Sequence, residues 1–99
     1  MRAKRVDNNQ ADVVKALERC GVQVFDTSGM GFGFPDLVLG FRGKTYLAEV
    51  KNGDTAWTFT PAQKRFHAEW NGDRPLIFTS VDDVALWIKR SASHTTAAV

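Results

Sequence analysis

Residues 35–51 read PDLVLGFRGKTYLAEVK, two apolar runs joined by a short polar segment. Both runs are rich in Val, Leu, Phe and Tyr, which favour strands, and residues 42–44 have the composition of a tight turn. The stretch therefore predicts an antiparallel hairpin with strands over residues 36–41 and 44–51.

Three charged residues interrupt these apolar runs: Asp36, Glu49 and Lys51. A two-residue turn at 42–43 places Asp36 directly opposite Glu49, with Cβ atoms about 5 Å apart on one face of the hairpin. Lys51 is two residues beyond Glu49 and points to the same face. Two like charges this close are unfavourable unless a cation lies between them. The alternative is a ladder of charges on a solvated sheet face, and these residues alone leave both readings open.

An acid pair beside a lysine suits the hydrolysis of phosphodiester bonds. Mg²⁺ and Mn²⁺ prefer oxygen ligands and keep several waters, one of which becomes a better nucleophile. A lysine close by can orient that water, accept its proton or stabilise the charged transition state. The Val50 side chain points to the opposite face, but its carbonyl oxygen can reach a metal at the strand edge.

The rest of the chain predicts helices and one more strand around the hairpin. Thr60-Pro61-Ala62-Gln63 is a helix start, with Thr60 as N-cap, Pro61 at the first helical position and Gln63 completing a capping box. The predicted order is αβββαβα, an α/β chain with a mixed, α+β-like sheet covered by helices. The expected elements are a helix over about 8–20, strands over 22–25, 36–41, 44–51 and 76–79, a helix from 60 to 70, and a last helix from 80 to 90.

Length and composition indicate one ordinary globular domain. The chain has 99 residues, 43% of them hydrophobic and 24% charged, with a net charge of +2. This predicts a single domain over residues 1–90 and a disordered tail over 91–99. No apolar stretch is long enough to span a bilayer, no signal peptide is expected, and Cys20 has no partner for an internal disulfide. We therefore expect a cytoplasmic protein.

Four segments together resemble a known family of nucleases. Gly33-Phe34-Pro35-Asp36-Leu37-Val38 and Ala48-Glu49-Val50-Lys51 resemble the signature of the PD-(D/E)XK nuclease superfamily. Phe59-Thr60-Pro61-Ala62-Gln63 and Asn9-Gln10-Ala11-Asp12 are similar to segments of its small, stand-alone VRR-NUC branch, common in phages. The resemblance covers about residues 7–90 and implies a restriction-endonuclease-like αβββαβ core followed by a C-terminal helix.

The resemblance implies Mg²⁺- or Mn²⁺-dependent cleavage of DNA, with Holliday junctions or flaps as the leading substrates. By that similarity Asp36, Glu49 and the Val50 carbonyl would bind the metal, and Lys51 would be the catalytic lysine. Many relatives add a glutamate on the first helix, where this chain offers Asp12 as the nearest acid. Asp12 is equally well explained by pairing with the helix dipole.

Several other polar residues have both a functional and an ordinary reading. Gln63 would face the active site in relatives, but the capping box also explains it. Ser28 lies in a glycine-rich loop that leads into a strand, so nucleotide binding is not expected there. Basic residues near the first and second helices would contact DNA phosphates or would simply be solvated. The predicted DNA-binding set is Ser28, Arg5, Lys15, Arg19 and Lys64.

Three aromatic or imidazole side chains near the second helix complete the candidates. His67 is expected to be a partly exposed helix-surface histidine rather than a catalytic base. Phe59 is expected to be buried, and Trp57 is left open among base stacking, a dimer interface and the edge of the core.

The sequence favours a DNA endonuclease that works as a homodimer on branched substrates, in a bacterial or phage-infected cytoplasm. Two symmetric active sites would then meet two symmetric strands. The alternatives are a DNA-binding or assembly module that has the fold without catalysis, and an RNA-processing nuclease with the same chemistry. No membrane and no nucleotide cofactor is expected.

Overall fold

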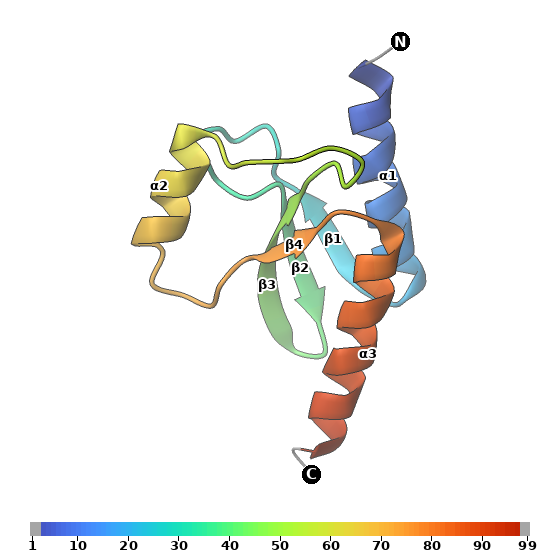
Figure 1. The fold of residues 1–99 in the computed structure, drawn as a ribbon. Coiled ribbons are helices and arrows are strands. Elements are labelled where there is room, and N and C mark those ends of the chain that lie inside the picture. The colour runs from blue at the N-terminus through green and yellow to red at the C-terminus, as the bar shows by residue number, and fades with distance from the viewer. Residues whose placement is uncertain (1–2, 98–99) are drawn as a thin grey trace.

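The predicted hairpin forms the centre of a four-stranded mixed sheet (Figure 1). The computed structural model describes residues 3–97, and the expected order αβββαβα is found there. The elements are α1 (Ala3–Arg19), β1 (Gln23–Asp26), β2 (Leu37–Phe41), β3 (Lys44–Val50), α2 (Pro61–Glu69), β4 (Leu76–Phe78) and α3 (Val81–Ala97).

The strands are arranged in the order β1-β2-β3-β4. β1 and β2 are antiparallel, as are β2 and β3, while β4 joins β3 in parallel after the crossover through α2. Leu37 pairs with Ala48, and Phe41 with Lys44. This is the predicted hairpin register, which sets Asp36 opposite Glu49 just beyond the end of β2.

Alternation along the hairpin separates a core face from a second face. Leu37, Leu39 and Ala48 are fully buried on one face. There they meet Val13 and Leu17 of α1 and Val84 of α3, so these two helices cover that side of the sheet (Figure 1). Trp87 of α3 extends this core through ring contacts with Phe41, Tyr46 and Phe78.

Helix α2 lies on the other side of the sheet (Figure 1). Its predicted start is confirmed: the Thr60 hydroxyl accepts from the Gln63 N–H at 3.1 Å, and Gln63 Oε1 accepts from the Thr60 N–H at 2.9 Å. None of its residues is fully buried, and it is held by a few polar and aromatic contacts. At its other end, the Arg74 guanidinium donates to the carbonyls of His67 and Trp70, which satisfies carbonyls left over at the helix terminus.

Both terminal helices are longer than the sequence predicted. α1 begins at Ala3 rather than near residue 8, and α3 continues to Ala97 through residues expected to form a tail. Neither added segment contains Gly or Pro, the two residues that disfavour a helix most, so nothing in them stops the helical pattern. Among the residues described, no helix is both long and apolar enough to cross a membrane.

Candidate functional site

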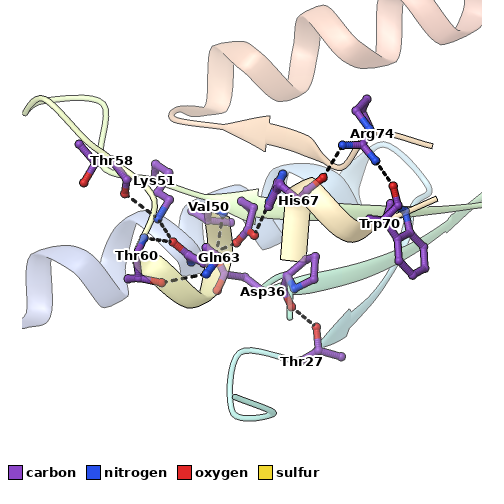
Figure 2. A network of polar contacts seen from close by, with 12 residues as sticks. Thr27, Asp36, Val50, Lys51, Thr58, Thr60, Gln63, His67, Trp70 and Arg74 are labelled. Carbon is purple, nitrogen blue, oxygen red and sulfur yellow. Dashed lines mark hydrogen bonds and ion pairs between the residues drawn. The ribbon is translucent and has the colours of Figure 1, made fainter. Parts of the chain in front are cut away.

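The second face of the hairpin presents an acidic cluster to helix α2. The cluster consists of Asp36, Glu49, Lys51 and Gln63, all predicted from the sequence, together with His67. Figure 2 shows the Lys51 and Gln63 side chains meeting between β3 and α2, with His67 further along α2. One direct contact ties Asp36 to the strand: its Oδ2 accepts a hydrogen bond from the Val50 N–H at 2.8 Å.

Glu49 lies at the centre of this cluster and has no solvent-exposed surface. Its Oε2 is 2.9 Å from His67 Nε2, and its Oε1 accepts a longer bond of 3.4 Å from Gln63 Nε2. Burial raises the pKa of Glu49; the His67 contact lowers it, and the charge of Asp36 raises it again. A buried acid beside a second acid is the environment that a bound cation would relieve.

The Lys51 side chain is held in place by hydrogen bonds and by nearby aromatic rings. Its ammonium donates to Gln63 Oε1 at 2.8 Å and to the Thr58 carbonyl at 3.3 Å. It also lies 5.4 Å from the ring centroid of Phe59 and 5.8 Å from that of Trp57, close enough for cation–π attraction. The amine is therefore held next to Gln63 by contacts on several sides.

Gln63 caps α2 and also faces the acidic cluster. One amide oxygen closes the capping box of α2 and accepts from the Lys51 ammonium. The amide nitrogen of the same group reaches Glu49. Helix capping and cluster geometry thus depend on one side chain.

The loop before β2 brings Asp36 to α2. Pro35 is buried, and its carbonyl accepts from the Thr27 hydroxyl at 2.7 Å. Gly33 has φ +75° and packs so closely that an added Cβ would collide with the Ala62 carbonyl. Phe34 contacts Phe66 edge-on with ring centroids 5.5 Å apart. The Gly-Phe-Pro segment therefore positions the acid that follows it.

His67 is partly exposed on α2, as predicted, but it makes contacts that the sequence did not predict. Its side chain is only 15% exposed, contacts Glu49 and stacks on Phe59 with ring centroids 4.3 Å apart. Its spacing of four residues after Gln63 is the signal that both face the sheet. Phe59 is half-buried, in the direction expected, and Trp57 is 38% exposed.

On the first helix, Asn9 rather than Asp12 reaches the cluster. Asn9 Nδ2 donates to the Lys51 carbonyl at 2.8 Å, whereas Asp12 is exposed. Among the side chains described, no three His, Cys, Asp or Glu residues form a metal-binding group of their own. The two hairpin carboxylates would need the Val50 carbonyl and water to complete a coordination shell, as Mg²⁺ sites commonly do.

The DNA-binding candidates that the structure describes lie on several elements. Lys15 and Ser28 line an open groove of about 660 Å³ between α1 and the end of β1. There Asp26 accepts from the Ser28 hydroxyl and N–H, which lower the pKa of its carboxyl. Arg19 is exposed at the end of α1, and Lys64 is exposed on α2. The Arg5 side chain lies outside the described residues.

Comparisons of this chain with models of protein families, with curated proteins and with solved structures found no match.

Proposed function

We propose that this chain is a divalent-metal-dependent endonuclease that hydrolyses DNA phosphodiester bonds on a restriction-endonuclease-like core. The observation that carries the proposal is the convergence of Asp36, Glu49 and Lys51 on one face of the hairpin, opposite Gln63. A sheet gains no stability from a buried acid next to another acid, so a chemical role accounts for the arrangement better than a structural one.

The donor set fits Mg²⁺ or Mn²⁺. Asp36, Glu49 and the Val50 carbonyl would supply oxygen ligands, which these ions prefer, and water would complete the shell. When bound, such an ion polarises the scissile phosphate and lowers the pKa of a coordinated water.

The remaining residues of the cluster act on charge and orientation. Lys51 stabilises negative charge that develops on the phosphate, since its ammonium is already held by Gln63 and Thr58. Gln63 keeps the amine and Glu49 in a fixed relation, which avoids reorganisation during the reaction. The substrate is DNA, and branched junctions or flaps cut by a homodimer in the cytoplasm remain our expectation.

A cleavage panel tests the proposal. Junction, flap, duplex and single-stranded DNA, with RNA as a fifth substrate, are incubated with the protein in Mg²⁺, Mn²⁺ or EDTA. We expect cutting of DNA that requires the metal and is abolished by Asp36→Asn, Glu49→Gln or Lys51→Ala. Glu69→Gln is the control, because Glu69 is exposed on α2 and forms its salt bridge with Arg65, which is also exposed.

The outcomes separate the candidate functions. Absence of metal-dependent cutting by folded wild-type protein would overturn the nuclease proposal. Salt-dependent DNA binding without cleavage or Mn²⁺ affinity would instead support the binding module. Cleavage of RNA but not of DNA would support the RNA-processing nuclease.

A further inference from the structure

His67 is the member of the cluster that the resemblance did not include, and it makes the shortest contact to the buried acid. We propose that His67 is a positioning residue for Glu49: its ring, clamped by Phe59, holds the carboxylate in the orientation that binds a divalent cation. This inference rests on the proposed metal-dependent function and adds a residue to it.

Two residues on one face of α2 each contact a different carboxylate oxygen of Glu49. His67 Nε2 is 2.9 Å from Oε2, and Gln63 Nε2 is 3.4 Å from Oε1. Glu49 binds a cation as the ionised carboxylate, which can only accept, so in that form the imidazole Nε2 carries the proton and donates it. Because Glu49 is fully buried and His67 is only 15% exposed, little water competes for this bond.

The imidazole is itself restrained on several sides. It stacks on Phe59 with an interplanar angle of 28°, and the Phe66 ring lies edge-on to it with centroids 6.0 Å apart. The backbone of His67 is tied to the Arg74 guanidinium by a 2.7 Å bond. A ring with so little freedom fixes the direction of the hydrogen bond that it donates.

A carboxylate oxygen has room for both a hydrogen bond and a metal. The bond from His67 uses one lone pair of Oε2 and leaves others free, while it prevents the side chain from rotating. Partners that orient metal-binding side chains in this way are commonly worth about tenfold to a hundredfold in metal affinity or activity. Phe59 also lies under the Lys51 ammonium, so one ring supports both the acid and the amine.

Titration of Mn²⁺ alone into the full chain, followed by calorimetry, tests the role of His67. His67→Phe keeps an aromatic ring against Phe59 but removes the donor, whereas His67→Gln keeps a donor at a similar reach. Glu69→Gln on the exposed side of α2 is the matched control, and the melting temperature of every variant is measured in EDTA.

We expect His67→Phe to weaken Mn²⁺ binding about tenfold to a hundredfold. His67→Gln should restore most of the affinity, and Glu69→Gln should leave it unchanged. In DNA cleavage, His67→Phe should lower kcat with little change in KM, because the residue acts on Glu49 and not on the substrate.

Wild-type affinity in His67→Phe would overturn the inference and leave the metal site intact. Equal losses in His67→Phe and His67→Gln would also overturn it, since the donor would then not be the operative group. Failure of the wild-type protein to bind Mn²⁺, with or without DNA, would instead overturn the proposed function. If His67→Phe does not fold, Phe59→Leu removes the ring that stacks on His67 while the imidazole donor stays in place, and unchanged affinity in that variant contradicts the proposal.

Discussion

Glu49 occupies a position that is unfavourable for an ionised side chain. It is fully buried, and burial together with the nearby Asp36 raises its pKa above the ordinary value of 4.5. A group whose pKa is higher in the folded state favours folding when it is protonated. The contribution of Glu49 to stability is therefore fully present below pH 4.5 and is lost as the pH rises through the raised pKa.

We accordingly predict that Glu49→Gln is more thermally stable than wild type at pH 7 in EDTA, although it should not cut DNA. The amide removes a buried charge and its repulsion by Asp36 but can still accept a hydrogen bond from His67. The difference in melting temperature should shrink as the pH falls toward 4.5, where the wild-type carboxyl becomes protonated. Thermal unfolding of both proteins at several pH values measures it, and a less stable variant at pH 7 would contradict the prediction.

Sequence reasoning found the residues of the site that lie within short motifs. The hairpin register could be predicted because a two-residue turn fixes which residues lie opposite each other. The contact between His67 and Glu49 could not, because it joins residues 18 positions apart and depends on how α2 packs on the sheet. Asn9 was missed for the same reason, since its partner Lys51 is 42 positions away.

At the scale of elements, the loop before β2 and the start of α2 form one unit. Gly33 has φ +75° and no room for a Cβ against the Ala62 carbonyl, whereas Gly31 has φ +78° and open space. The positive φ favours glycine at both positions. Of the two, Gly33 is the one where the loop also packs tightly against α2. Substitutions at Gly31 and Gly33 therefore distinguish the cost of backbone strain from the cost of a steric clash.

We predict that Gly33→Ala destabilises the protein more than Gly31→Ala. The cost at Gly31 should be about 1–2 kcal/mol, the strain of a left-handed alanine, and Gly33 adds a steric displacement of α2. Gly33→Ala should also impair cleavage, because the same loop carries Asp36. Chemical denaturation and cleavage assays on both variants test this. Equal losses of stability and activity would mean that the loop and helix are not coupled.

The cap of α2 offers a second test at this scale. Thr60→Ala removes a helix cap and should cost about 1 kcal/mol of stability while cleavage is retained. Gln63→Ala keeps the Thr60 cap, which accepts from a backbone N–H, but removes the Gln63 Oε1 that accepts from the Thr60 N–H. It also removes the contacts to Lys51 and Glu49, so it should lose most of the activity for no greater loss of stability. Denaturation and cleavage rates measured together distinguish the two roles. Equal activity in both variants would leave Gln63 as a capping residue only.

Element order was predictable because each helix and strand has its own local signals, such as periodicity, caps and turns. The ends of the helices were harder to predict than the order of the elements. The first and last helices extend beyond the expected limits because no residue in the added segments breaks a helix, and the sequence also lacks a positive signal there. α2 lies on the face opposite α1 and α3, which is the face that carries Glu49.

At the scale of the whole molecule, the hairpin divides two tasks between its faces. Leu37, Leu39 and Ala48 point into the core between the sheet and helices α1 and α3, while Glu49 and Lys51 point toward α2. The alternation of side chains along a strand makes this separation possible. Stability is concentrated on one face, so the other can carry charged groups that are individually unfavourable.

This division predicts that Leu39→Ala lowers stability without altering the chemistry of the folded protein. Removal of a fully buried leucine costs about 2–5 kcal/mol, a large part of the roughly 5–15 kcal/mol that stabilises an ordinary domain. Leu86 on α3 is 48% exposed, so Leu86→Ala is the control and should cost less than about 1 kcal/mol of stability. Denaturation curves give the stabilities, and cleavage at low temperature, normalised to the folded fraction, should match wild type for both variants. A reduced kcat in folded Leu39→Ala would show instead that the core and the acidic cluster are mechanically linked through the strands they share.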